Sequence, residues 1–289
     1  MVHQSDWQLI LALHNYKSVT KASQALYIAQ PAVTRRLSQL EDEFHVTIAI
    51  RNSKGLLFTP EGEFLADYAE HMVNEYEQLQ SHLRAADGKP FGTLHIAASS
   101  SLSRFLLPGL LGSFKKKYSE VEFSLESEFS FKVSQMVNTQ KAHVGFIRGD
   151  YESGCEHFLI GTQKAVIASA KPFDWDDLPQ MPRIDFYADA LSLSNIDKWW
   201  YEYYKEAPKI SMTVNNGHTC AEMVKNGLGY AVFLTSEFIQ DTDGICIRPL
   251  KHPDGSFLIR NDWMIYREEF LEMGLVKAFV DYAKKYTFT

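Results

Sequence analysis

The sequence has few cysteines and no long apolar run, and both absences narrow the class of protein. No apolar run approaches the roughly 18–20 residues that a membrane-spanning helix needs. The N-terminus contains Asp6 and no small-residue cleavage site, unlike a secretory signal. Cys155, Cys220 and Cys246 are far apart and form no Cys-x-x-Cys pair, which argues against a disulfide framework or a zinc site. We therefore expect a cytoplasmic protein with reduced thiols, no metal and no membrane association.

Enzyme signatures are also lacking. The chain has no Gly-x-Ser-x-Gly elbow, no His-Glu-x-x-His, no P-loop and no complete Gly-x-Gly-x-x-Gly. Its ten histidines are scattered without the spacing of metal ligands. The glycines of "KNGLGYAVF", residues 225–233, are typical of a turn between a helix and a strand. The sequence predicts no catalytic residues and no cofactor.

Charge is unevenly distributed along the 289-residue chain, whose formal net charge is −7. Residues 1–58 contain six Lys and Arg but four Asp and Glu, so this part is +2 and the remainder is −9. An acidic protein does not coat nucleic acid nonspecifically, whereas a small basic part can contact it locally. Any nucleic-acid contact is therefore expected in the N-terminal part.

Apolar periodicity divides the chain into three expected domains, at 1–59, 60–89 and 90–289. The first contains three short helical patterns, each too short to be stable alone, which must share a core. It ends in "VTIAIRNSKGLLFTPEG", residues 46–62, where two apolar runs flank an Asn-Ser-Lys-Gly turn signal. This pattern predicts a β-hairpin.

The second region predicts one long helix over 60–87, followed by a hinge at 87–90. Its apolar residues recur every three or four positions: Phe64, Tyr68, Met72, Tyr76, Leu79 and Leu83. They form one apolar stripe along the helix. The stripe can pack within its own domain or against a second copy, and its length favours a dimerising coiled coil.

Beyond residue 90, strand and helix patterns alternate, from "GTLHIAAS" at 92–99 to a final helix at 268–286. Such alternation predicts an α/β fold with parallel sheets, arranged as one sheet or as two smaller lobes. The aromatic segment "KWWYEYYKE", residues 198–206, is interpreted as a packing face, with base stacking as the alternative.

Two consecutive arginines stand out in "SVTKASQALYIAQPAVTRRLSQLE", residues 18–41. A helix over 30–41 has an apolar stripe formed by Val33, Leu37 and Leu40. Arg35 points away from this stripe, whereas Arg36 lies on its flank. A short preceding helix, which we expect to begin near Thr20 as its N-cap, completes a helix-turn-helix.

An exposed arginine pair can also be an ordinary solvated helix face. In that interpretation Arg35 and Arg36 pair with Glu41 or Asp42. The predicted hairpin, which carries Arg51 and other basic and polar residues, stands where the wing of a winged helix stands. Its position favours the nucleic-acid interpretation.

Residues 1–87 resemble the winged helix-turn-helix and linker helix of the LysR-type transcriptional regulators. The resemblance covers the 18–41 stretch and "RNSKGLLFTPEG" at the family spacing. The segments "LLPGLLGSFKKKYSEVEFSLE", "AHVGFIRG" and "TCAEMVKNGLGYAVF" resemble successive parts of the family's effector-binding domain. The resemblance implies an all-α, winged head and two α/β lobes like those of periplasmic binding proteins. Lobe I is expected at about 90–162 and 266–289, and lobe II at about 163–265.

The resemblance also assigns DNA contacts. Residues expected to face the major groove are Gln30, Pro31, Thr34 and Arg35; those facing phosphates are Thr20, Lys21 and Arg36; those in the wing are Arg51 and Lys54. The chain departs from the family pattern at Ala29, where a Ser usually caps the recognition helix. His45 and Ala49 stand in place of a usual Gly and a usual wing Phe.

The effector site is placed by the same resemblance around Ser100, Ser101, Ser130, Arg148, His218 and Thr219. Arg148 follows a predicted strand directly, so it lies at the carboxyl end of a sheet, where open α/β folds bind ligands. Hydroxyls beside one arginine suit a small carboxylate or a similar anion. The alternative for Arg148 is a surface ion pair with Asp150.

The sequence therefore indicates a sequence-specific, DNA-binding transcriptional regulator controlled by a small-molecule effector between two α/β lobes. The resemblance implies a bacterial homodimer or homotetramer that binds double-stranded promoter DNA and contacts RNA polymerase. The alternative is a soluble small-molecule receptor or enzyme whose helical head only dimerises.

The two functions differ in the effect of replacing Arg35. In a regulator, Arg35→Ala is expected to cost about 1–3 kcal/mol of specific DNA binding, because a contact to a base is lost. Fluorescence anisotropy on the DNA upstream of the protein's own gene, with a scrambled duplex as control, measures this cost. Equal binding by the variant and the wild type would favour the alternative.

Overall fold

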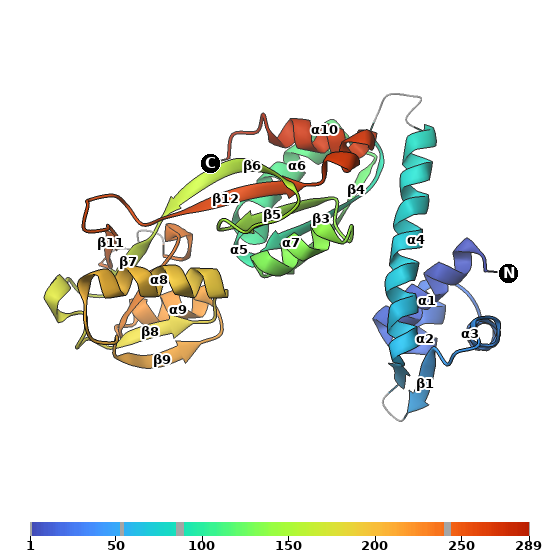
Figure 1. Cartoon of the computed structure of the whole chain (residues 1–289), viewed down its shortest axis with the longest axis horizontal. Coiled ribbons are helices and arrows are strands. Elements are labelled where there is room, and N and C mark those ends of the chain that lie inside the picture. The colour runs from blue at the N-terminus through green and yellow to red at the C-terminus, as the bar shows by residue number, and fades with distance from the viewer. Residues whose placement is uncertain (1, 53–54, 85–89, 240–243, 289) are drawn as a thin grey trace. The chain divides into compact units, whose positions relative to one another are not determined.

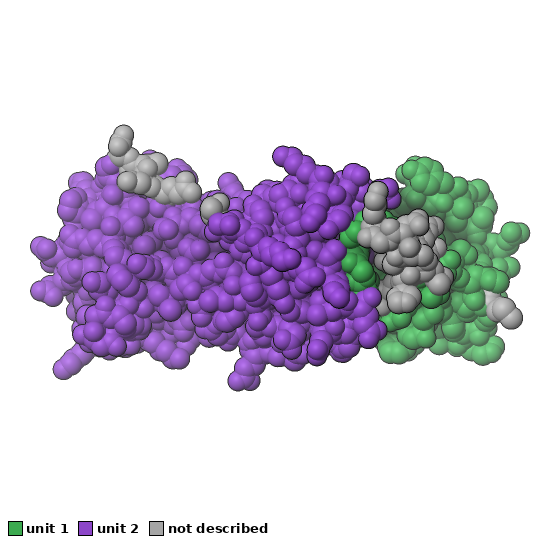
Figure 2. Space-filling view, turned by 90° about the horizontal axis from the view of Figure 1, so that it is seen from above, with its two compact units in different colours: residues 1–92, 273–275 green, residues 93–272, 276–289 purple. Residues whose placement is uncertain are grey.

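The structure is a computed structural model that describes residues 2–52, 55–84, 90–239 and 244–288. The chain forms two compact units, residues 1–92 with 273–275 and residues 93–272 with 276–289 (Figure 2). Among the described residues, no helix is both long enough and apolar enough to cross a membrane.

The first unit is a helical head with a small hairpin (Figure 1). It contains α1 (Gln4–Tyr16), α2 (Val19–Ala25), α3 (Gln30–Phe44), β1 (Ala49–Asn52) and β2 (Gly55–Phe58). Apolar side chains from all three helices and from the hairpin segment meet in one core, whose fully buried members include Ile10, Leu13, Ala22, Val33, Leu40 and Ile48. Because each helix buries only one stripe, the short helices are stable together and not separately.

The start of α2 differs from the expectation. Ser18, and not Thr20, is the N-cap, and its hydroxyl accepts a hydrogen bond from the backbone N–H of Lys21 at 3.4 Å. The prediction of Thr20 as the cap is wrong because the helix already begins at Val19. Thr20 is consequently an exposed residue within the first turn.

Two of the departures from the family pattern, Ala29 and His45, lie at the ends of α3. Ala29 is the N-cap and offers no side-chain hydrogen bond. His45 follows the last turn with a φ of 57°, in the left-handed conformation that glycine adopts without strain. A glycine is therefore the residue expected at this position, and histidine occupies it here.

The hairpin is confirmed, with β1 and β2 antiparallel and Asn52 opposite Gly55. The backbone N–H of Leu56 donates to the carbonyl of Lys17, just after α1, at 2.8 Å. Gly55 has a φ of 127°, and a Cβ there would lie 2.5 Å from the same carbonyl oxygen. Only glycine permits this close approach of the hairpin to the end of α1.

The long helix, α4 (Pro60–Arg84), is confirmed over 60–84. Residues 85–89, which hold most of the expected hinge, lie outside the described part of the chain. Ala66 and Ala69 pack into the head core. On the apolar stripe, by contrast, Phe64 is 72% and Leu79 is 52% exposed.

The second unit contains two mixed five-stranded sheets. The first, in the order β4-β3-β5-β12-β6, consists of β3 (Gly92–Ser99), β4 (Val121–Glu128), β5 (Val144–Arg148), β6 (Glu156–Lys164) and β12 (Ile259–Tyr266). The second, in the order β11-β7-β10-β8-β9, consists of β7 (Val166–Ser169), β8 (Arg183–Phe186), β9 (Ile210–Val214), β10 (Tyr230–Phe233) and β11 (Cys246–Pro249).

The alternation of strands and helices predicts parallel sheets. Both sheets instead contain parallel and antiparallel pairs. β3 pairs parallel with β5, and β8 pairs parallel with β9 and β10. β12 is antiparallel to β5 and β6, and β7 is antiparallel to β10 and β11. The antiparallel pairs arise because β6–β7 and β11–β12 are the segments that cross between the lobes.

The helices of the second unit flank these sheets. They are α5 (Ser100–Phe105), α6 (Leu107–Lys117), α7 (Ser130–Asn138), α8 (Ala190–Tyr203), α9 (Gly217–Lys225) and α10 (Gly274–Ala283), with short 3-10 turns η2 (Trp175–Asp177), η3 (Ser236–Phe238) and η4 (Glu268–Glu272). The final helix, expected over 268–286, is shorter because η4 precedes it.

The two crossings are hydrogen-bonded to each other. Ala165 links β6 to β7, and its N–H donates to Leu258 at 2.8 Å while its carbonyl accepts from Leu250 at 2.9 Å. β12 begins directly afterwards, at Ile259. Residues 259–265, which the sequence analysis assigns to lobe II, therefore lie in the first sheet, because β12 pairs along its whole length with β6.

The interpretation of 198–206 as a packing face is confirmed for its two tryptophans. Trp199 and Trp200 on α8 are buried in the core of the second lobe. The indole N–H of Trp200 also donates to the carbonyl of Glu206 at 2.8 Å. Base stacking by these two rings is excluded by their burial.

Trp200 and its neighbour Tyr201 provide a matched test of this core. Trp200→Ala is expected to lower the free energy of unfolding by about 3–5 kcal/mol, because a large buried ring leaves a cavity. Tyr201→Ala, at a side chain that is 59% exposed, is expected to change it by less than about 0.5 kcal/mol. Urea unfolding measures both values, and equal effects would contradict the assigned packing.

Candidate nucleic-acid interface and ligand pocket

Five of the predicted DNA-facing residues are exposed on the first turns of α2 and on α3. They are Thr20, Lys21, Gln30, Pro31 and Arg35. The Thr20 hydroxyl donates to Oε1 of Gln30 at 3.4 Å, which brings the starts of the two helices together. The exposed polar residues at the starts of α2 and α3 thus form one surface.

The consecutive arginines have different environments. Arg36 donates from Nε to Oδ1 and from Nη2 to Oδ2 of Asp6 on α1, each at 2.6 Å, and also donates to Gln39 at 3.2 Å. Arg35 is exposed and has no ion pair or hydrogen bond with any described residue. Glu41 and Asp42, the partners expected if the arginines were a solvated helix face, make none of these contacts.

Asp6 is the buried member of the Arg36 pair, with 3% of its surface exposed. The hydrogen bond from Arg36 is the largest cause that lowers the pKa of its carboxyl, and burial opposes it. Its Oδ2 also accepts from the backbone N–H of His3 at 2.6 Å. Asp6 therefore fixes both the start of α1 and the position of α3.

The hairpin contacts the same helix. Arg51 on β1 donates from Nη2 to the hydroxyl of Thr34 at 2.8 Å. Arg51 therefore lies beside α3, as the expected wing requires. Lys54, the second predicted wing residue, lies outside the described residues.

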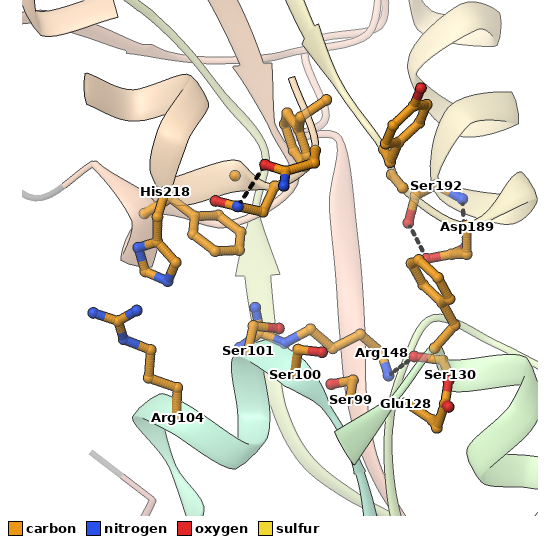
Figure 3. A pocket seen from close by; sticks show the side chains of 18 of the residues that line it. Ser99, Ser100, Ser101, Arg104, Glu128, Ser130, Arg148, Asp189, Ser192 and His218 are labelled. Atoms are coloured by element: carbon orange, nitrogen blue, oxygen red, sulfur yellow. Dashed lines mark hydrogen bonds between the residues drawn. The ribbon is translucent and has the colours of Figure 1, made fainter. Parts of the chain in front are cut away.

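A cavity of about 330 Å³ opens in the second unit where strand ends of the first sheet face the starts of α8 and α9 (Figure 3). The predicted residues that line it are Ser100, Ser101, Ser130, Arg148 and His218. Thr219 is not a lining residue, and its backbone N–H donates to Oδ1 of the N-cap residue Asn216 at 2.9 Å.

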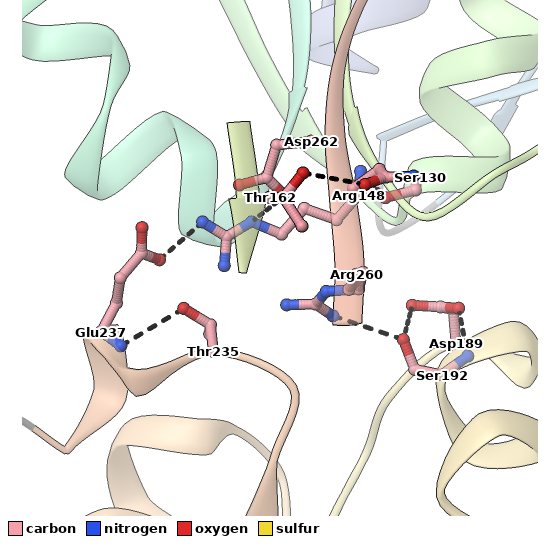
Figure 4. Close-up of polar contacts among 10 residues, drawn as sticks. Ser130, Arg148, Thr162, Asp189, Ser192, Thr235, Glu237, Arg260 and Asp262 are labelled. Carbon is pink, nitrogen blue, oxygen red and sulfur yellow. Dashed lines mark hydrogen bonds and ion pairs between the residues drawn. The ribbon is translucent and has the colours of Figure 1, made fainter. Parts of the chain in front are cut away.

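Arg148 is buried at the end of β5, with 2% of its surface exposed. Its Nη2 contacts Glu237 at 2.6 Å, its Nε lies 3.2 Å from Oδ1 of Asp262, and its backbone N–H donates to Ser130 at 3.0 Å (Figure 4). Asp150 instead accepts from Trp263 at 2.8 Å. The expected alternative, a surface ion pair between Arg148 and Asp150, is not what the structure shows.

A second arginine lies beside this cluster. Arg260 on β12 donates to the Ser192 hydroxyl at 3.4 Å, and burial is the main cause that lowers its pKa to about 10. Burial likewise raises the pKa of Asp262. At the floor of the cavity, the charges of the two guanidinium groups are thus balanced by the carboxylates of Asp262 and Glu237.

Asp189, the N-cap of α8, lies in the opposite wall of the cavity. Its carboxylate accepts from the N–H and the hydroxyl of Ser192, both at 2.9 Å, and from the Tyr151 hydroxyl. Burial and this hydrogen bond raise the pKa of Tyr151 above its usual range. Tyr151 follows the first sheet and Asp189 belongs to the second lobe, so this contact joins the lobes.

Sequence reasoning missed several lining residues. Arg104, Asp189, Arg260 and the Arg148 partner Glu237 are single charged residues in separate segments, with no spacing pattern among them.

The three cysteines are free thiols. Within the described ranges, no group of three or more His, Cys, Asp and Glu could hold a metal ion.

A winged helix-turn-helix in one unit and a ligand-sized cavity between two α/β lobes in the other define a ligand-responsive DNA-binding regulator. Residues 5–63 match the model for bacterial regulatory helix-turn-helix proteins of the lysR family, and residues 87–287 match the LysR substrate binding domain. The chain belongs to the LysR family of transcriptional regulators.

Relatives along the whole chain support this membership. The uncharacterized HTH-type transcriptional regulator YraN of Bacillus subtilis is 34% identical over 282 residues, which are 97% of each chain. YkuM of the same organism is 29% identical over 96% of each chain.

Solved structures share the fold. Full-length CbnR complexed with its target DNA has a TM-score of 0.70 and 17% identity, over 98% of this chain and 99% of that chain. HinK, a LysR family transcriptional regulator from Pseudomonas aeruginosa, has a TM-score of 0.55 and 18% identity, over 99% of this chain and 98% of that chain.

The adjacent arginines are expected to differ in their effect on stability. Arg36→Ala leaves the buried Asp6 carboxylate without its main partner and is expected to cost about 1–3 kcal/mol at neutral pH. Arg35→Ala is expected to cost less than about 0.5 kcal/mol. Urea unfolding followed by circular dichroism measures both.

The cost of Arg36→Ala is also expected to depend on pH. The folded pKa of Asp6 lies below its ordinary value of 3.8, so the pair contributes fully above that pH. Its contribution is lost as the pH falls through the lowered pKa of the folded protein. A difference between wild type and variant that stays constant down to the lowest pH at which the protein folds would contradict this assignment.

Proposed function

We propose that the head reads promoter DNA with the exposed surface of α2 and α3, and that the cavity binds a small-molecule effector. The observation that supports the first part most directly is the division of labour between neighbouring arginines. Arg36 is held by Asp6, whereas the adjacent Arg35 is unpaired and exposed on the recognition helix. An unpaired guanidinium on this helix is available for a bidentate contact to guanine.

The remaining contacts follow from their positions. Gln30 and Pro31, at the start of α3, face base edges, while Thr20 and Lys21 on α2 contact phosphates. Arg36 orients α3 through Asp6 and contributes to phosphate binding only indirectly. In the wing, Arg51 and Lys54 contact the DNA backbone. Arg51 also holds the Thr34 side chain in position through its hydrogen bond. CbnR, which has the same fold, has been solved with its target DNA.

The effector occupies the cavity between the two sheets. Its volume suits a small metabolite, and Ser100, Ser101 and Ser130 supply hydroxyls for polar ligand atoms. Ligand contacts with both lobes favour one relative arrangement of the lobes, which alters DNA binding and the contact with RNA polymerase. Thr219 supports the site from behind, through the N-cap of α9. We assign the protein no catalytic role.

The exposed stripe of α4 is the proposed contact between copies. Phe64, Tyr68 and Leu79 are 72%, 47% and 52% exposed in the single chain, on a helix of 25 residues. Pairing of two such stripes buries these side chains. A homodimer, or a homotetramer built from two such dimers, binds an interrupted palindrome in the bacterial cytoplasm.

A blocked cavity tests the link between the two parts. Ser100→Trp is expected to fill the cavity and to abolish the change in DNA affinity that any effector causes, without altering DNA affinity in its absence. Ser194→Trp, on the exposed face of α8 away from this cavity, is the control. Anisotropy with the upstream duplex measures both, and an effector response that survives Ser100→Trp would contradict the assignment.

A further inference from the structure

Positive charge is neutralised at the floor of the cavity but not at its rim. Arg148 contacts both Asp262 and Glu237, and Arg260 lies beside the same carboxylates. An incoming acidic group that binds Nη2 of Arg148 would therefore have to displace Glu237, which lies 2.6 Å away. Nη1 of Arg148 makes no hydrogen bond with the described residues, but it belongs to the same neutralised cluster. A buried ion pair resists such exchange, because the displaced carboxylate must find another partner.

The rim carries one cation and one imidazole without such partners. Arg104 is exposed on α5, and His218 is half-buried in the first turn of α9. Figure 3 shows the two side chains facing each other at the same end of the cavity. Neither has an ion pair or a hydrogen bond with any residue that the structure describes.

Aromatic rings surround this pair. The His218 ring lies 5.0 Å, edge-on, from that of Phe238 and 5.6 Å from that of Phe105, and the Arg104 guanidinium is 5.6 Å from the Phe105 ring. Apolar surroundings strengthen the attraction between the Arg104 guanidinium and an anion, and the imidazole of His218 offers a ring N–H beside it. They also explain why burial, followed by the charge of Arg104, lowers the pKa of His218.

A polar group further inside the cavity also lacks a partner. Ser99 is 7% exposed and lines the cavity, and its hydroxyl makes no hydrogen bond within the described structure. A buried hydroxyl without a partner is costly unless a ligand or water satisfies it. It therefore indicates where polar atoms of a ligand lie.

We propose that the effector is a small anion whose carboxylate or phosphate group binds between Arg104 and His218 at the rim, and not at Arg148. The rest of the ligand extends inward to Ser99. This inference rests on the proposed effector role of the cavity. Because Arg104 follows the first sheet and His218 belongs to the second lobe, one bound anion joins the two lobes.

Titration with acetate and with inorganic phosphate, followed by NMR of the histidine ring signals of the full-length protein, tests the rim site. Sodium chloride keeps the ionic strength constant, and His218→Gln assigns the His218 signal. Saturable movement of this signal is expected for at least one anion. Arg104→Gln is expected to weaken the apparent affinity by about tenfold or more, because a charged hydrogen bond is lost. Lys116→Ala, which removes an exposed charge on α6 away from the cavity, is expected to leave it unchanged.

Two results would overturn the rim site. One is a His218 signal that neither anion moves, and the other is an affinity that Arg104→Gln leaves intact. In the second case, loss of binding in Ser100→Trp would keep the effector role of the cavity while placing the anion elsewhere. Failure of the wild type to prefer its upstream duplex would instead contradict the proposed DNA function, independently of any anion.

Discussion

The buried guanidinium of Arg148 is the constraint on which the arrangement of the second unit depends. A charge with 2% exposure at a strand end must be compensated, and one partner, Asp262, comes from the neighbouring strand of the same sheet. The other, Glu237, comes from the second lobe. The requirement to neutralise one arginine therefore ties the lobes together. Arg104 at the rim takes no part in this neutralised cluster.

In the head, a similar constraint separates two residues that look alike in the sequence. Asp6 is buried at the start of α1 and needs a cation, and Arg36 on α3 provides it. Arg35, 100° further around the helix, is directed elsewhere. In the proposed function, recognition depends on both, since Arg35 binds DNA while Arg36 holds the helix in place.

Local patterns predicted the elements well, because helix periodicity, the turn signal before Gly55 and the strand before Arg148 depend on neighbouring residues. The family resemblance brought together five residues that line the cavity: Ser100, Ser101, Ser130, Arg148 and His218. Partners that are distant in sequence were not predictable: Asp6 with Arg36, Glu237 with Arg148, and Tyr151 with Asp189. Nothing in the spacing of single charges signals such pairs. The parallel-sheet prediction failed for the same reason, because the return of β12 to the first sheet is a long-range event.

The paired crossings at Ala165 and 250–258 have a mechanical consequence. Two segments that are hydrogen-bonded side by side restrain each other more than two single connections would. The ladder between β6 and β12 runs up to this paired link, with Ile259 opposite Lys164, so little free chain remains between the lobes. The lobes are therefore joined by a short link that limits their independent movement. In the proposed function, a small molecule held by both lobes acts across this link and changes the relative position of the lobes.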